Sequence, residues 1–212
     1  IEAFEKVLQL TPHHPGALMG QWRASMECCK WTGLDLVRRQ VESHLLAAET
    51  HALLPFESLS FTEDPAIHFR AAKVFGDAII HRESFVPMQH VPRTSKRARI
   101  KVAYLSSDFH EHATAHLTAE LFERHDRSRF EIVALSFGPD DGSPMRKRLQ
   151  QAFDQFIDVR DAASDSVAAQ IALMEVDILV DLKGYTRGAR TSVLLRKPAP
   201  IVVNYLGYPG TM

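Results

Sequence analysis

The sequence predicts an α/β fold in its second part, where helices cover both faces of a parallel sheet, and an all-helical segment before it. Two observations lead to this prediction. From Arg99 onward, short runs rich in Val, Ile and Leu alternate with stretches of helical periodicity, which is typical of βαβ units. Before Arg99, apolar residues recur at helical spacing and are interrupted by breaks that contain proline.

Five strands are expected in the second part, each followed by a loop. They cover residues 100–105, 130–137, 155–159, 177–182 and 201–206. Helices are expected between them, over residues 114–123, 145–153, 164–174 and 189–195. In parallel sheets of this kind, ligands bind outside the carboxyl ends of the strands. The loops that follow the strands are therefore where a site is expected.

The first part is predicted to contain paired helices. Apolar side chains of the first helix fall mostly on one face, and Pro12 ends it. Phe4, followed by Pro12 eight residues later, resembles the second helix of a tetratricopeptide repeat. An ordinary amphipathic helix pair would fit this single partial repeat as well. Further helices are expected over residues 15–26, 32–52 and 65–82, with an irregular connection from residue 53.

Three segments follow from these patterns. We expect the end of a tetratricopeptide-like helical region over residues 1–52, a helical and irregular linker over 53–98, and a sheet lobe over 99–212. The chain starts inside a helix without Met and stops just after a strand, so we expect both ends to be cuts through a larger protein.

Composition narrows the possible functions. Of 212 residues, 45% are hydrophobic and 24% are charged, and the formal net charge is -1. Such a balance is typical of a soluble globular protein and offers no bulk charge to attract nucleic acid or a membrane surface. No apolar run approaches the roughly 20 residues of a membrane span. The two cysteines, Cys28 and Cys29, are adjacent and cannot form a disulfide framework, so a reducing cytoplasmic setting is expected.

Three loops at strand ends carry the candidate functional residues. They cover residues 106–116, 183–190 and 207–211 and would bring a carboxylate, several histidines, hydroxyls and two arginines to one rim of the sheet. Asp108 and His112 are the candidates for chemistry, because an imidazole titrates near neutral pH and suits acid–base work or hydrogen bonding to a sugar. Asp108 could equally make an Asx turn or cap a helix.

A metal site is not expected among the histidines of the first loop. His110 and His116 are interpreted as a solvated residue and as a packing or capping residue. The zinc protease motif requires a second histidine where this chain has Thr114. The acidic pair Asp140-Asp141 is bracketed by Pro139 and Gly142 and is predicted to form a turn.

Six segments, in this order and at this spacing, resemble the protein O-GlcNAc transferase family (glycosyltransferase family 41), and the last of them looks like the bacterial branch. They are Tyr104–Phe109, His112–Leu117, Gly138–Gly142, Gly184–Arg190, Lys197–Pro200 and Leu206–Thr211. The resemblance implies an enzyme of the GT-B type, with two Rossmann-like lobes and the active site between them. This chain would supply the end of the tetratricopeptide repeats and the N-terminal lobe, and the lobe that binds most of the UDP would be absent.

The family transfers N-acetylglucosamine from UDP-GlcNAc to Ser or Thr hydroxyls of proteins, with inversion and without a metal or other cofactor. Asp108 and His112 match residues proposed as its catalytic base, and the resemblance does not decide between them. Positions matched to donor-sugar or substrate binding are Thr114, Tyr185, Arg187, Arg190, Leu206, Gly207, Tyr208 and Pro209. Arg187 and Ala113 depart from the animal members, which have Lys and Pro there.

The resemblance also implies what the chain lacks and what it could be instead. Without a clamp for the diphosphate, the isolated chain is not expected to turn over. Protein acceptors are the expected partners, with no nucleic acid and no membrane. Two alternatives remain open: a SPINDLY-like protein O-fucosyltransferase that uses GDP-fucose, and a non-catalytic repeat module that binds proteins.

Overall fold

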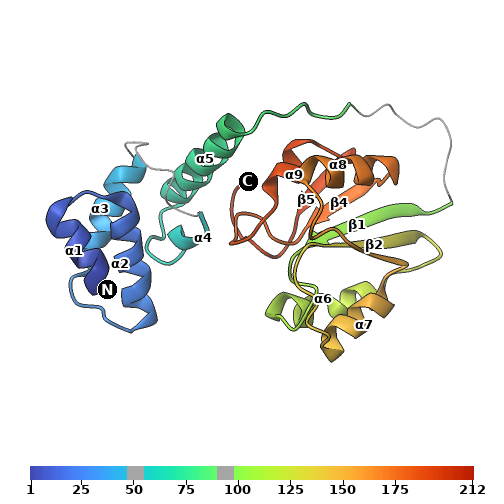
Figure 1. Cartoon of the computed structure of the whole chain (residues 1–212), viewed down its shortest axis with the longest axis horizontal. Coiled ribbons are helices and arrows are strands. Elements are labelled where there is room, and N and C mark those ends of the chain that lie inside the picture. The colour runs from blue at the N-terminus through green and yellow to red at the C-terminus, as the bar shows by residue number, and fades with distance from the viewer. Residues whose placement is uncertain (47–54, 90–97) are drawn as a thin grey trace. The chain divides into compact units, whose positions relative to one another are not determined.

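The computed structural model describes residues 1–46, 55–89 and 98–212, which form two compact units. The first unit is Ile1–Arg82 with Gly210–Met212, and the second is Glu83–Pro209 (Figure 1). The segment expected as a linker is thus divided, because helices over its first part belong to the first unit. The end of the helix expected over 32–52 lies outside the described residues.

The first unit is helical, as predicted. Its helices are α1 (Glu2–Leu10), α2 (Pro15–Glu27), α3 (Leu34–Leu46), α4 (Pro55–Ser58) and α5 (Pro65–Arg82). Helix α4 lies where an irregular connection was expected; Pro55 starts it, and the hydroxyl of Ser58 donates to the Pro55 carbonyl at 2.6 Å. Helices α1 and α2 pack closely, since a Cβ on Gly20 would lie less than 3.0 Å from the ring of Phe4.

The second unit contains one sheet in which all five strands run parallel, in the order β3-β2-β1-β4-β5. The strands are β1 (Ile100–Ser106), β2 (Phe130–Ser136), β3 (Gln155–Asp158), β4 (Ile178–Asp181) and β5 (Ile201–Asn204). The helices are α6 (Ala113–Glu123), α7 (Pro144–Ala152), α8 (Ser164–Leu173) and α9 (Thr191–Leu195). Every strand and helix predicted for this part is present, with ends that differ by at most two residues.

Helices cover both faces of the sheet (Figure 1). Alternate residues of β1 enter two separate cores, because successive side chains of a strand point to opposite faces. Val102 and Tyr104 pack with α6 and α7, whereas Ala103 and Leu105 pack with α8 and α9. Burial on both faces explains why β1 is a continuous apolar run and not an alternating one.

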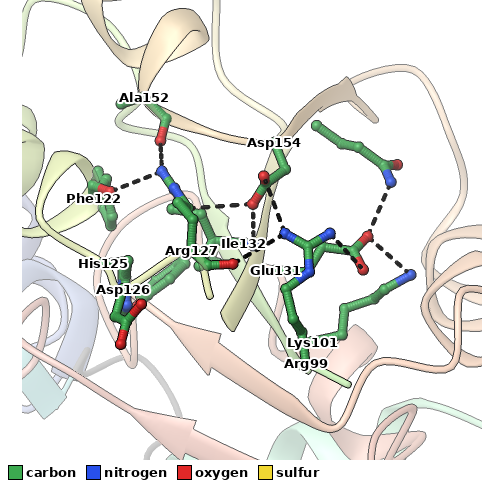
Figure 2. Close-up of polar contacts among 12 residues, drawn as sticks. Arg99, Lys101, Phe122, His125, Asp126, Arg127, Glu131, Ile132, Ala152 and Asp154 are labelled. Carbon is green, nitrogen blue, oxygen red and sulfur yellow. Dashed lines mark hydrogen bonds and ion pairs between the residues drawn. The ribbon is translucent and has the colours of Figure 1, made fainter. Parts of the chain in front are cut away.

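Charged side chains connect the amino-terminal ends of neighbouring strands (Figure 2). Arg99 lies 3.7 Å from Asp154, and Lys101 lies 3.2 Å from Glu131. The other oxygen of Asp154 accepts the Ile132 N–H at 2.7 Å. These contacts hold the starts of β1, β2 and β3 together. They lie at the amino-terminal ends of the strands, opposite the candidate loops.

The strand order reverses at β1. From β1 the chain adds β2 and β3 on one side, then crosses over to add β4 and β5 on the other. In such sheets a crevice opens between the loops that leave the two strands at the reversal, and ligands bind there. The strand order therefore predicts a ligand site between the loops after β1 and β4. None of the described helices is long and apolar enough to cross a membrane.

Candidate functional site

A buried ion pair joins the loops at the reversal point. Lys183, after β4, places its Nζ 3.0 Å from both carboxylate oxygens of Asp108, after β1. Only 9% and 8% of the two side chains are exposed. Ser107 donates its hydroxyl to Asp108 Oδ1 at 2.6 Å, and the Asp108 N–H donates to Ser106 Oγ at 3.0 Å. Both oxygens of Asp108 are thus engaged, and the carboxylate has a fixed orientation.

Lys183 was not among the residues predicted from the sequence. A lysine directly after a buried strand, level with an aspartate that follows the neighbouring strand, was the signal available. The alternative interpretation of Asp108 as a helix cap is wrong, because His112 is the N-cap of α6.

His112 caps α6 through its ring. Its Nδ1 accepts the N–H of Thr114 at 3.1 Å and lies 3.8 Å from Asp108 Oδ2. Because Nδ1 is the acceptor, the neutral ring carries its hydrogen on Nε2. The side chain is 42% exposed. His112 thus presents the N–H at Nε2 to a ligand. Protonation of Nδ1 would break the hydrogen bond from the Thr114 N–H and would place the new N–H beside the Asp108 carboxylate.

The other histidines of this loop are in different surroundings. His116 Nε2 contacts Glu111 Oε1 at 2.5 Å on the exposed face of α6, and the ring of His110 lies 5.6 Å from that of His112. Across residues 1–46, 55–89 and 98–212, no three His, Cys, Asp or Glu side chains are grouped so that they could hold a metal ion.

The loop after β5 packs onto the loop after β4. A Cβ on Gly207 would lie less than 3.0 Å from the carbonyl oxygens of Leu182 and Lys183, so only glycine fits at this contact. The rings of Tyr185 and Tyr208 lie 5.7 Å apart. The segments that begin at Asp108, Gly184 and Gly207 therefore lie together at the carboxyl-terminal ends of the strands, as the sequence predicts.

Asp181, the last residue of β4, holds the start of the loop that follows this strand. Its carboxylate accepts the N–H groups of Lys183 at 3.2 Å and Gly184 at 2.8 Å. Burial raises the pKa of Asp181 above its ordinary value, and the two N–H donors oppose that rise. The turn after β4, with Gly184 at φ 57°, is thereby held so that the Lys183 side chain reaches Asp108.

Tyr208 is almost completely buried, with 2% exposed, and its hydroxyl has no hydrogen-bond partner among the described residues. Burial raises the pKa of this phenol above its ordinary value. A buried hydroxyl without a partner carries a free-energy cost. Leu206, with φ 70°, and Pro209 flank it and are exposed.

The two arginines matched to the site differ. Arg187 is exposed. Arg190 instead donates to the carbonyl oxygens of Val159 and Ala162, after β3, and its guanidinium lies 5.7 Å from the Phe137 ring. Burial lowers the pKa of Arg190. Arg190 therefore links two loops of the rim, and Arg187 is the member of the pair that faces solvent.

The acidic pair after β2 lies in the loop between Ser136 and Pro144, and one member reaches the first loop. Asp140 Oδ1 accepts the Gly142 N–H at 3.0 Å, and Gly142 has φ 64°. Asp141 Oδ2 accepts the Glu111 N–H at 2.9 Å. This contact holds the backbone next to His112.

Comparison with known proteins gives the class to which this fold and this site belong, a glycosyltransferase. The matching model is that of glycosyl transferase family 41, which covers residues 34–212. The chain belongs to this family.

A plant relative and an animal relative are consistent with this family assignment. The chain is 31% identical over 185 residues to an Arabidopsis thaliana protein named "Probable UDP-N-acetylglucosamine–peptide N-acetylglucosaminyltransferase SEC", covering 84% of this chain and 18% of that protein. It is 31% identical over 195 residues to the Caenorhabditis elegans UDP-N-acetylglucosamine–peptide N-acetylglucosaminyltransferase, covering 86% of this chain and 17% of that protein. The chain thus spans under a fifth of the length of these relatives.

A solved structure shares the fold. A mutant of the Thermobaculum terrenum O-GlcNAc transferase matches with a TM-score of 0.65 and 20% identity, over 97% of this chain and 46% of that chain.

Proposed function

We propose that this chain is the acceptor-side lobe of an enzyme that transfers N-acetylglucosamine from UDP-GlcNAc to Ser or Thr hydroxyls of proteins, with inversion at the sugar carbon. The observation that carries the proposal is the cluster of Asp108, Lys183 and His112 at the point where the strand order reverses. The names of the relatives supply the donor and the peptide acceptor.

Transfer to a hydroxyl has two requirements. The acceptor oxygen is a weak nucleophile and attacks better as it loses its proton. The departing diphosphate develops negative charge, which cations and helix N-termini stabilise. We assign the first requirement to this lobe, with Asp108 and His112 as the candidate bases that accept the proton, and the second to a further lobe of the longer protein. For that reason the 212-residue chain alone is expected to be inactive.

The individual side chains have distinct proposed roles. The Nε2–H of His112 donates a hydrogen bond to a substrate oxygen, with Thr114 beside it at the start of α6. Tyr208, whose ring lies 5.7 Å from that of Tyr185, supports the lining of the site. Leu206 and Gly207 lie against the sugar, Tyr185 and Pro209 line the site, and Arg187 provides the exposed cation for an acidic group of donor or acceptor.

We propose that no metal ion takes part. Asp108 is the carboxylate best placed to bind one, but both of its oxygens contact the Lys183 ammonium at 3.0 Å. A divalent cation would have to displace that ammonium and would meet its positive charge. Chelation of metals with EDTA is therefore expected to leave the transfer rate unchanged.

The setting of the enzyme is also proposed. Helices α1 to α3 are assigned to the end of a tetratricopeptide-like region that presents protein acceptors. The location is assigned to the cytoplasm, in keeping with the two adjacent free cysteines, Cys28 and Cys29.

The test is sugar transfer by the natural gene product that contains these residues. It is incubated with a protein extract and with UDP-GlcNAc or GDP-fucose, and modified Ser and Thr are identified by mass spectrometry. Transfer from UDP-GlcNAc, lost in His112→Ala and Asp108→Asn, is the expected result. Wild-type rates in both variants would contradict the assigned site.

The same experiment weighs the other functions. SPINDLY proteins of plants are also relatives, but that of Arabidopsis thaliana is only 24% identical over 53% of this chain. Transfer from GDP-fucose alone would favour that branch. Tight peptide binding with no transfer from any nucleotide sugar would favour a non-catalytic binding module.

A further inference from the structure

We propose that Lys183 is a positioning residue for the transfer reaction, whose ammonium holds the Asp108 carboxylate fixed beside His112. The inference deepens the proposed function and rests on it. It adds a residue that the family resemblance did not point to and assigns it a task.

The contact joins two segments that are far apart in sequence. Asp108 and Lys183 are separated by 75 positions, yet they follow strands that are paired neighbours, with Leu105 opposite Asp181. The ammonium is 3.0 Å from each carboxylate oxygen, so it bridges the carboxylate symmetrically. The carboxylate cannot rotate without losing one of these contacts.

Both ends of Lys183 are held. Its backbone N–H donates to Asp181 Oδ1 at 3.2 Å, and the next N–H, of Gly184, donates to Asp181 Oδ2 at 2.8 Å. Its side chain is 9% exposed and ends on Asp108. Asp108 in turn is held by the hydroxyls of Ser107 and Ser106. The result is a rigid connection from the end of β4 to the loop that carries His112.

Stability alone does not account for such a pair. Replacing a buried ion pair by apolar side chains of similar size is often neutral or stabilising, because burial removes both charges from water. This pair lies at the strand reversal, where ligands bind in such sheets, and 3.8 Å from the Nδ1 of His112. Placement of a charge next to the reacting groups is the role that this location supports.

The test compares four variants of the natural gene product: Lys183→Met, Lys183→Arg, Asp108→Asn, and the double variant Asp108→Asn/Lys183→Met. Since a misplacement of about 1 Å can cost roughly 100-fold in rate, kcat in Lys183→Met is expected to fall by about that factor. The KM for UDP-GlcNAc is expected to change little, because the donor is bound mainly by the other lobe. Lys183→Arg keeps the charge and should recover part of the rate.

The double variant separates positioning from folding. It leaves no unpaired charge at positions 108 and 183, so its Tm should exceed that of Lys183→Met, while its kcat should equal that of Asp108→Asn. Lys147→Met, an exposed lysine on α7, is the matched control and should behave as wild type. Wild-type kcat in Lys183→Met, or losses that multiply in the double variant, would overturn the inference. If Lys183→Met does not fold, Lys183→Gln, whose amide can still donate to Asp108, and the double variant decide the question.

A measurement without substrate keeps the inference distinct from the proposed function. Amide hydrogen exchange of residues 108–114 should be faster in Lys183→Met than in wild type, because the carboxylate no longer anchors the loop. If the wild-type protein transfers no sugar, the proposed function fails, and with it the catalytic role. Unchanged exchange would instead refute the positioning itself, whatever the activity.

Discussion

Gly138 lies so close to the backbone of Ser107 that a Cβ on it would be less than 3.0 Å from the Ser107 carbonyl oxygen. The loop after β2 therefore packs directly against the backbone of Ser107, the residue that precedes Asp108. Gly138→Ala is expected to lower the free energy of unfolding by about 1–3 kcal/mol, as overpacking does elsewhere, and to reduce sugar transfer. Calorimetry and the transfer assay on the natural gene product measure both effects.

A second glycine in the same loop is the control for this prediction. Gly142 has φ 64°, but no atom of the described residues lies within 4 Å of the place for a Cβ. Gly142→Ala meets only the backbone penalty of about 1–2 kcal/mol for the left-handed conformation. The transfer rate should remain normal in Gly142→Ala, and equal loss of activity in the two variants would show that contact with Ser107 is irrelevant.

His112→Asn separates capping from chemistry. Asparagine is a strong N-cap residue, whereas His112→Ala loses the bond to the Thr114 N–H and should cost about 1 kcal/mol of stability. His112→Asn should therefore melt near the wild-type temperature and still transfer sugar slowly, because it lacks the Nε2–H. Recovery of activity together with stability would mean that His112 acts only as a cap.

Features of the fold and the site that depend on residues close in sequence could be predicted, whereas contacts between residues far apart in sequence could not. The strands and helices follow local patterns, and the β1 and β4 loops meet because parallel strands place their carboxyl ends at one edge. The Asp108–Lys183 pair was missed because 75 positions separate it, and strand order decides which loops are neighbours. Arg190 is the converse case: motif matching places it at the acceptor side, but the direction of its side chain depends on the carbonyls of the β3 loop.

Arg146 is predicted to be essential for stability. It is 2% exposed, donates to the Phe109 carbonyl at 2.9 Å and to Ser136 Oγ at 2.7 Å, and lies 4.4 Å from the centre of the Phe156 ring. Arg146→Met leaves two buried acceptors without donors and should cost about 2–4 kcal/mol. Thermal denaturation measures this loss.

The control for Arg146 lies on the same helix. Arg148 makes a bidentate pair with Glu123 at 2.6 and 2.8 Å, but both side chains are substantially exposed, so Arg148→Met should change Tm little. A larger loss from Arg148→Met than from Arg146→Met would contradict the importance of burial here.

The bond between Asp141 and the Glu111 N–H predicts a pH dependence. This bond is the largest cause of a fall in the pKa of Asp141 from 3.8 to about 2, and hydrogen bonds from Ser143 also lower it. A lowered pKa contributes stability above the unfolded-state value, and that contribution is lost as the pH falls toward 2. The difference in Tm between wild type and Asp141→Ala should therefore be constant from pH 7 to about 5 and shrink below 4. A difference that does not vary with pH would show that the ionised Asp141 carboxylate does not contribute to stability through these hydrogen bonds.

The two arginines of the Gly184–Arg190 segment should respond differently to replacement. Arg190→Ala removes donors from the Val159 and Ala162 carbonyls and should lower stability by about 1–3 kcal/mol. Arg187→Ala removes an exposed cation and should leave Tm unchanged while raising the KM for donor or acceptor. Steady-state kinetics and melting curves on both variants distinguish these outcomes. If Arg190→Ala keeps its Tm and raises KM, its guanidinium binds substrate rather than the β3 loop, because a structural donor cannot be removed without loss of stability.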